Sequence, residues 1–386
     1  MNRNKAIINL FAAHLVNDIY TPVIMAILPV LISTYGYSYY LAACLAATHS
    51  ISSSVLQPVF GWLSDKKGFS IAVSISILMS GCFISMIGLV SEWYLVMILF
   101  VALAAIGHAS FHPAALSIMS DFSANENRGV MTSYFVVGGN LGFALGPVIA
   151  GTVLAVAGFI GVALLMIPAC IVALLLRNLS LNRTRQSLAS SSQLSFKKEL
   201  LLLKPIYTLF CASSLRAWVI FGSITFFPLY LVFEGYSVLF ATTLVTGMLL
   251  AGVVGQMTGG YLSDRYGRKD YLVITTFLVI PFFILFITST GIVAVIAMFF
   301  FGFLLWSTFA FTIAMAHETM PGNIGLASGL FMGSALGAGG IGVAASGYIA
   351  DHFGLILSIA LFGFLIVLSG FFYVIVPQPW KTISRS

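Results

Sequence analysis

Long apolar runs fill most of the chain, and short breaks of polar, charged or glycine residues separate them. A helix needs about 20 apolar residues to cross the hydrocarbon core of a bilayer. Twelve runs of roughly that length cover residues 7–34, 40–63, 70–90, 94–119, 129–157 and 159–176 in the first half, and 206–233, 237–262, 271–289, 292–316, 324–349 and 354–376 in the second. This pattern predicts an all-α membrane protein with twelve transmembrane helices.

One of the polar breaks occurs twice. Residues 61–68 read GWLSDKKG after the second run, and residues 260–267 read GYLSDRYG after the eighth, 199 residues later. A repeat at half the chain length indicates two related halves. We therefore predict two pseudo-symmetric six-helix halves, 1–176 and 205–386, joined by a basic, serine-rich linker at 177–204.

The composition excludes a soluble protein. Hydrophobic residues make up 60% of the chain and charged residues only 7%, whereas a soluble domain carries about 25% charged residues. The four cysteines lie inside apolar runs without the spacing of a zinc site, so we interpret them as packing residues. We expect no cofactor.

The 17 Lys and Arg residues are unevenly distributed. Sixteen of them precede the first run, follow the last, or lie in the linker and the other breaks after even-numbered runs. The opposite breaks carry only acidic charges, at Glu92, Glu234 and Asp351. By the positive-inside rule, both termini and the linker are cytoplasmic. The same asymmetry accounts for the net charge of +6, so we expect no nucleic-acid partner.

The two halves and their repeated loop resemble the major facilitator superfamily. That family carries the pattern G-x-x-x-D-(R/K)-x-G after the second and eighth spans, and the resemblance covers the whole chain. The second copy is the more complete, because Arg268 and Lys269 follow Gly267, whereas Phe69 and Ser70 follow the first copy. The resemblance implies a secondary transporter and not an enzyme, in which two halves give alternating access to a midplane site.

A narrower resemblance lies in the first five runs. Its motifs are His14-Leu15-Val16-Asn17-Asp18, Leu56-Gln57-Pro58, Phe111-His112-Pro113 and Gly138-Gly139-Asn140-Leu141-Gly142. They look like the fosmidomycin-resistance branch of the superfamily, which is associated with drug efflux at the bacterial inner membrane. One departure is Ala114, where the branch suggests an acidic residue.

A glycine motif in the fifth run bears on the direction of transport. Gly142, Gly146, Pro147 and Gly151 resemble the G-x-x-x-G-P-x-x-x-G element of exporters that exchange substrate for protons. Small residues allow helices to approach closely, and Pro147 can bend the span. The alternative is tight packing without any bearing on direction.

Asp18 is the only acidic residue deep inside a predicted span, and His14 lies one turn earlier on the same helix face. An ionisable group at a helix centre costs roughly 2.5–3.5 kcal/mol, so such a residue is a candidate for function. A carboxylate in low dielectric can load and release a proton near physiological pH. We predict that Asp18 and His14 carry a coupling proton. Alternatively, they form a structural hydrogen bond that fixes helix packing.

His108 and His112 are also four residues apart, so both can face one cavity. Histidine titrates near neutrality, which suits proton coupling, and neutral hydrogen bonds between helices are the alternative. His14 and Asp18 could complete a metal site with them. The spacing does not require a closed coordination shell, however, and we predict no metal.

Arg216 lies near the middle of the seventh run and is permanently charged. It needs a counter-charge, which is either Asp18 or an anionic group of the substrate. We predict an anion-binding role for Arg216, with a static ion pair as the alternative. The other candidates for the substrate site are Asn17, Asn140, Trp218 and Trp306.

The repeated loop predicts a conformational latch on the cytoplasmic side. Asp65 and Asp264 can bind the positive end of a helix or a neighbouring cation such as Arg128. A simple basic loop would not explain an acidic residue at the same place in both halves. The gating candidates are Gly61, Asp65, Gly68, Arg128, Gly260, Asp264, Arg265, Gly267 and Arg268.

These features predict a bacterial inner-membrane transporter that couples the export of a small, anionic drug or metabolite to protons. Its partners are then the substrate, protons and the lipid bilayer, and we expect a monomer. An importer or a metabolite exporter on the same fold is the alternative. A membrane sensor or enzyme is a further alternative, but no paired catalytic constellation is visible, and the longest stretch outside the runs is the 28-residue linker.

Overall fold

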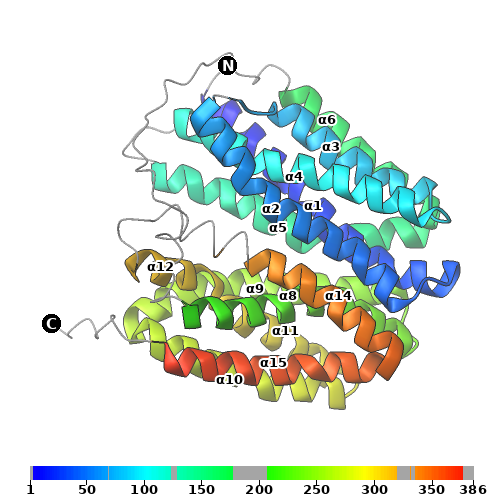
Figure 1. Ribbon diagram of the computed structural model, residues 1–386, viewed down its shortest axis with the longest axis vertical. Coiled ribbons are helices and arrows are strands. Elements are labelled where there is room, and N and C mark those ends of the chain that lie inside the picture. The colour runs from blue at the N-terminus through cyan, green and yellow to red at the C-terminus, as the bar shows by residue number, and fades with distance from the viewer. Residues whose placement is uncertain are drawn as a thin grey trace. The chain divides into compact units, whose positions relative to one another are not determined.

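The computed structural model describes residues 3–67, 69–122, 128–176, 207–319, 331 and 335–376 (Figure 1). Nearly all of these residues are helical, and none of them lies in a strand. The first half contains α1 (Arg3–Tyr35), α2 (Tyr39–Lys67), α3 (Val73–Met86), the 3-10 helix η1 (Ile87–Leu89), α4 (Tyr94–Phe122), α5 (Arg128–Ala157), the 3-10 helix η3 (Phe159–Leu165) and α6 (Met166–Leu176). The second half contains α8 (Tyr207–Phe233), α9 (Val238–Tyr266), α10 (Arg268–Thr288), α11 (Gly291–Ser307), α12 (Phe309–Thr319), α14 (Ala335–Phe353) and α15 (Leu355–Ile375).

Each of the twelve predicted runs contains a helix, and the main difference is in the run 292–316. That run is divided, because α11 ends at Ser307 and α12 begins at Phe309. Nine helices of the described residues are long and apolar enough to cross a membrane. The prediction of an all-helical membrane protein is therefore confirmed.

The described residues form two compact units. The first unit holds α1 to α6 together with Pro228–Thr246, and the second holds the described residues of 207–227 and those from 247 onward. The predicted linker 177–204 lies outside the described residues. The boundaries of the two predicted halves therefore stay a prediction.

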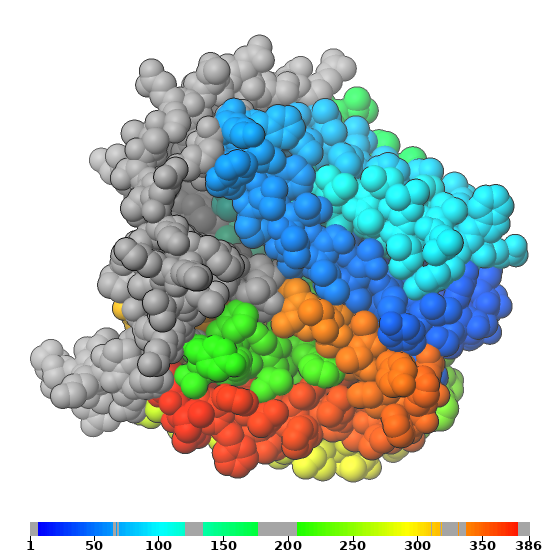
Figure 2. Space-filling model, viewed as in Figure 1, coloured from blue at the N-terminus to red at the C-terminus, as the bar shows by residue number. Residues whose placement is uncertain are grey.

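In the first unit, α1 packs along α5, and α4 packs against both α2 and α3. Figure 2 shows α2 and α4 side by side on one face of this unit. Gly142 and Gly146 of α5 face the backbone of α1: a Cβ at these positions would lie 2.0 Å from Leu15 O and 2.6 Å from Ile19 O. Only glycine permits this close approach, which brings α5 directly onto the polar stripe of α1.

In the second unit, α10 packs against α11 and α15, and α14 packs against α15. Glycines again bring two helices together, since a Cβ at Gly255 or Gly259 of α9 would lie 2.0 Å from Phe303 O or Ser307 O of α11. An apolar core at one end of the unit consists of Leu209, Ala212, Leu272, Phe311, Met315, Ala316, Phe331, Tyr373 and Val376. This packing holds the part of α8 that carries Arg216.

Candidate functional site

Four of the six histidines of the chain lie around Asp18 in the first unit. His14 Nε2 is 3.1 Å from Asp18 Oδ2 on α1, and His112 Nε2 on α4 is 3.7 Å from Asp18 Oδ1. His108 Nε2 is 3.3 Å from His112 Nε2. Helical spacing explains part of this convergence, because His108 and His112 are four residues apart, and so are His14 and Asp18. We call Asp18, His14, Asn17, His108 and His112 the Asp18 cluster.

Asn17 connects the two helices of the Asp18 cluster and fixes the roles of the imidazole nitrogens. Its Nδ2 donates to Asp18 Oδ1 at 2.9 Å and contacts His108 Nδ1 at 3.0 Å. An amide nitrogen can only donate, so His108 Nδ1 accepts and His108 Nε2 carries the hydrogen. His108 then donates to His112 Nε2. The lone pair of His112 Nε2 accepts this hydrogen, and Asp18 Oδ1 lies 3.7 Å from the same nitrogen.

Helix α5 packs against the Asp18 cluster through Phe135 and Gly139. His14 Nδ1 donates to the carbonyl oxygen of Phe135 at 2.7 Å, and the two rings stack with their centroids 4.0 Å apart. Because Nδ1 donates, Nε2 of a neutral His14 is an acceptor that faces the carboxylate. Gly139 lies one turn further along, where a Cβ would be 2.3 Å from His14 Nε2 and 2.8 Å from Asp18 Oδ2. Asn140 follows Gly139 on α5.

His49 of α2 adds a further buried imidazole beside the Asp18 cluster. Its ring centroid is 5.2 Å from that of His108, and the residue is only 1% exposed. Both ring nitrogens of His49, like Asn17 Oδ1, have no hydrogen-bond partner among the described residues. About 15% of the Asp18 side chain is exposed.

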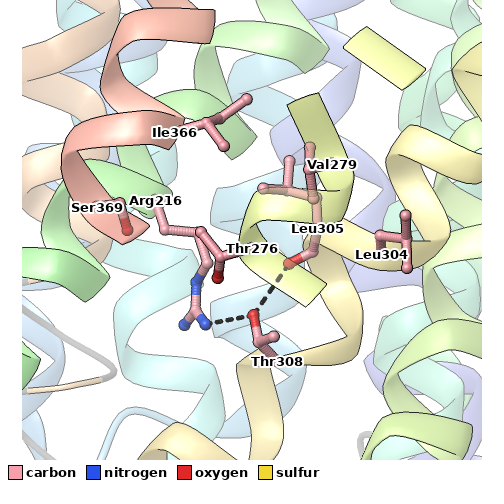
Figure 3. A pocket seen from close by; sticks show the side chains of 8 residues that line it. All are labelled: Arg216, Thr276, Val279, Leu304, Leu305, Thr308, Ile366 and Ser369. Carbon is pink, nitrogen blue, oxygen red and sulfur yellow. Dashed lines mark hydrogen bonds between the residues drawn. The ribbon is translucent and has the colours of Figure 1, made fainter. Parts of the chain in front are cut away.

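Arg216 is 5% exposed on α8 of the second unit. Its terminal nitrogens donate to Thr308 Oγ1 at 2.6 Å and to Thr312 Oγ1 at 3.0 Å (Figure 3 shows the bond to Thr308). Thr308 in turn donates to Leu305 O, and Thr312 donates to Phe309 O. Both threonine oxygens therefore act as acceptors, and they stabilise the guanidinium with dipoles instead of a charge.

The cavity beside Arg216 is small. It has a volume of about 10 Å³, which is the space of roughly one water molecule. Its lining consists of Arg216, Thr276, Val279, Leu304, Leu305, Thr308, Ile366 and Ser369 (Figure 3). No ion pair links Arg216 to an acidic side chain in the described part of the chain. A cavity of this size does not hold an organic substrate.

The two predicted tryptophans pack between helices of the second unit. Trp218 Nε1 donates to Ser346 Oγ at 2.8 Å, and a Cβ at Gly342 would lie 2.2 Å from the Trp218 ring. The Trp306 ring lies against α9, where a Cβ at Gly252 would be 2.9 Å away. Neither tryptophan lines the Arg216 cavity.

The second copy of the repeated loop joins α9 to α10 through a set of charges. Gly267 has a φ of 94°, which favours glycine, and it immediately precedes α10. Arg268 binds Asp264 Oδ1 at 3.1 Å and also donates to Glu318 Oε1 at the end of α12. Arg265 lies beside the Tyr266 ring, 5.7 Å from its centroid.

The first copy of the loop can be described only in part. Gly61 lies within α2, and Lys67 Nζ is 5.6 Å from the centroid of the Trp62 ring. Gly68 and the side chains of Asp65 and Arg128 lie outside the described residues. A Cβ at Gly61, or at the matching Gly260, would meet no atom within 4 Å. In this conformation neither glycine is needed for a close helix approach.

The sequence model of the Major Facilitator Superfamily matches residues 10–339 and 235–386. The chain belongs to the major facilitator superfamily. The superfamily and the transporter fold expected from the repeated loop are therefore confirmed, and the chain is a membrane transporter and not an enzyme.

Individual facilitators agree with this assignment. The fosmidomycin resistance protein of Escherichia coli K12 is 30% identical over 355 residues, which cover 88% of this chain and 85% of that protein. An uncharacterized transporter of the same superfamily from Bacillus subtilis 168 is 28% identical, with 92% and 88% covered. A bacterial homologue of the human lysosomal transporter Spinster, in an inward-facing and occupied conformation, has 17% identity, 96% coverage of both chains and a TM-score of 0.78.

The facilitator fold brings some predicted residues together and separates others. The Asp18 cluster unites the predicted proton-coupling residues with Asn17, which we expected at the substrate. Arg216 lies in the second unit with threonines. Sequence reasoning missed Gly139 as a contact of the cluster, although it lies in the quoted motif 138–142. It also missed Phe135 and Thr308, for which a carbonyl and a lone hydroxyl give no sequence signal.

Proposed function

We propose that this transporter exports a small anionic drug or metabolite in exchange for protons. It does so as a monomer in the cytoplasmic (inner) membrane of a bacterium, with both termini in the cytoplasm, and its two units give alternating access to the substrate. The observation that carries the proposal is the Asp18 cluster, in which one carboxylate faces two imidazole nitrogens at 3.1 and 3.7 Å.

The hydrogen-bond pattern supports a proton-binding role for the Asp18 cluster. When the histidines are neutral, His14 Nε2, Asp18 Oδ2 and His112 Nε2 are all acceptors. The hydrogen of His14 is on Nδ1, which donates to Phe135 O, and His112 Nε2 accepts the hydrogen of His108 Nε2. Two acceptors 3.1 Å apart repel unless a cation lies between them. A proton shared by His14 and Asp18 removes this repulsion. Loss of the proton to one side of the membrane and its return from the other give a coupling cycle.

Arg216 supports an anionic substrate. Its buried guanidinium is held by two threonine hydroxyls and lies 5.9 Å from the centroid of the Phe309 ring, and it carries a full positive charge at all physiological pH values. A carboxylate or a similar planar anion can pair with its forked donors better than two hydroxyl oxygens do. A substrate anion therefore gains energy when the helices around Arg216 open.

Export is supported by the glycine motif at 142–151 and by the resistance protein of Escherichia coli, which is similar over most of both chains. Fosmidomycin is accordingly one of the compounds to test. The alternative, import on the same fold, predicts the opposite direction of flux under the same gradient.

Transport against a gradient tests the proposal. The full chain in proteoliposomes, loaded with radiolabelled organic anions or fosmidomycin, is given an imposed pH gradient. We expect uphill movement for wild-type protein. Asp18→Asn should lose it while retaining downhill counterflow, and Asp351→Asn, which removes an exposed carboxylate, serves as the matched control. Uphill transport by Asp18→Asn at the wild-type rate would exclude Asp18 as the coupling site.

A further inference from the structure

We propose that His14, Asp18 and His112 also form a binding site for one divalent transition-metal ion of the Zn²⁺ type. The ligand atoms are His14 Nε2, one carboxylate oxygen of Asp18 and His112 Nε2, and all of them lie within 4.8 Å of one another. The inference concerns the same side chains as the proposed proton site. Metal binding, however, requires neither transport nor a pH gradient.

The distances are close to those of a metal site. In a tetrahedral site with bonds of 2.0–2.1 Å, neighbouring ligand atoms are about 3.3 Å apart. His14 Nε2 is 3.1 Å from Asp18 Oδ2, and His112 Nε2 is 3.7 Å from Asp18 Oδ1. All three ligand atoms lie within 4.8 Å of one another, so side-chain rotations on α1 and α4 have to bring them about 1 Å closer to form the shell. Three protein ligands leave the fourth position to water or another small ligand.

The hydrogen-bond partners of His14 and Asp18 orient these two ligands toward one point. His14 Nδ1 donates to the Phe135 carbonyl, which leaves Nε2 free to coordinate, and this outer hydrogen bond is typical of metal-binding histidines. Asn17 donates to Asp18 Oδ1 in the same way. His112 Nε2 accepts from His108 in the metal-free site, so it has to give up that hydrogen bond when it coordinates an ion. His14 and Asp18 are thus oriented for binding without any metal, and His112 completes the site by exchanging one partner for another.

The ligand chemistry selects the ion class. Two imidazoles and one carboxylate suit Zn²⁺, Co²⁺ and Ni²⁺, whereas Mg²⁺ and Ca²⁺ prefer shells made of oxygen. One carboxylate offsets half of the dication's charge. The Asp18 side chain is 15% exposed and so is not fully enclosed by the described residues.

Metal and proton compete for the same atoms. A bound ion takes the lone pair of His112 that otherwise accepts from His108, and it occupies the position between His14 and Asp18 where the shared proton lies. Micromolar Zn²⁺ should therefore inhibit transport, more strongly as protons become scarcer.

Binding is measured on the full-length protein in detergent, purified with a histidine-free tag and treated with a chelator. Co²⁺ is then titrated into the protein while the visible absorption spectrum is recorded. We expect one equivalent with the intense d–d bands of a low-symmetry site, displaced by Zn²⁺. His112→Gln and Asp18→Asn each remove a ligand and should lower the affinity for Co²⁺. The loss should be at least the roughly 10- to 100-fold that removal of a ligand's hydrogen-bond partner costs. His352→Gln removes an exposed imidazole and should bind Co²⁺ as the wild type does.

Three outcomes would overturn the site: no saturable Co²⁺ band in the wild type, equal binding by His112→Gln, or equal loss in His352→Gln. Thermal unfolding without metal shows whether each variant is folded. X-ray absorption at the zinc edge of the wild-type complex keeps the test decisive even if a variant misfolds. It should show two imidazoles with oxygen, and a shell with sulfur or without imidazole contradicts the assignment. Failure of proton coupling would leave these measurements unchanged.

Discussion

Asp18 and Arg216 are both charged residues inside apolar helices, but their surroundings differ. Asp18 has two imidazoles and an amide within 3.7 Å. A single proton shared with His14 makes this pair neutral overall and removes the repulsion between the two acceptor atoms. Arg216 has two hydroxyl oxygens whose own hydrogens are already donated to α11 and α12. The first residue can change its charge locally, and the second cannot. On the proposed function, an anionic group of the substrate pairs with this permanent charge.

Arg216→Gln should weaken the binding of anionic substrates far more than the binding of neutral ones. A hydrogen bond to a charged group is worth about 1.5–3 kcal/mol, which corresponds to roughly a 10- to 150-fold change in affinity. Arg216→Lys keeps the charge but loses the fork, so it should fall in between. Competition binding with matched acids and amides measures the ratio. An equal loss for acids and amides would assign Arg216 to packing.

At the level of elements, the pairing of α1 with α5 determines the shape of the Asp18 cluster. A Cβ at Gly142 would meet the backbone of α1 first, whereas the atoms nearest to a Cβ at Gly139 belong to the ends of His14 and Asp18. Backbone cannot move aside cheaply, but side-chain ends can. The same helix pair therefore contains positions that govern stability and a position that governs the site.

Gly139→Ala and Gly142→Ala should consequently fail in different ways. Gly139→Ala displaces His14 and Asp18, so we expect uphill transport to fall about tenfold or more, since a displacement of 1 Å at a reacting site can cost that much. Its melting temperature in detergent should change little. Gly142→Ala overpacks the interface and should cost about 1–3 kcal/mol of unfolding free energy. The reverse pattern would mean that the site does not depend on the contact with Gly139.

The charges at the start of α10 should act on conformation and not on stability. Arg268 binds Asp264 on α9 and Glu318 on α12, all of them partly or fully exposed. Exposed ion pairs contribute only about 0.2–1 kcal/mol, so Glu318→Gln and Asp264→Asn should leave the melting temperature nearly unchanged. If the pairs latch one conformation, the transport rate should still change several-fold, and a double-mutant cycle with Arg268→Gln should show coupling. Rates that merely follow protein level would argue against a latch.

How far the sequence predicts this site depends on the range of each contact. Helical spacing predicts the pairs His14–Asp18 and His108–His112. The length of the apolar runs predicts the helices themselves, so the pairs and the helices can be read from the sequence. The meeting of α1 with α4 is not visible, because tertiary packing decides it. Arg216 shows the limit most clearly: its burial follows from the run, but its threonine partners, 92 and 96 residues away, do not.

At the scale of the whole molecule, the arrangement of charges predicts one orientation in the membrane. Sixteen of the 17 basic residues lie at the termini, in the linker or in the breaks after even-numbered runs, and the opposite breaks contain none. Basic residues near a span are retained on the cytoplasmic side, so both termini should be cytoplasmic.

Reporter fusions check this orientation directly. A fluorescent protein after Ser386 should fluoresce, because such a reporter folds in the cytoplasm. Alkaline phosphatase, which needs an oxidising compartment for its disulfides, should be active after Glu92 or Glu234 and inactive after Ser190 in the linker. Adding four lysines beside Glu234 should lower the phosphatase activity there, since the positive-inside bias at that loop is then reversed. Activity after Ser190 with none after Glu92 would invert the proposed topology, and the direction of proton-driven flux would invert with it.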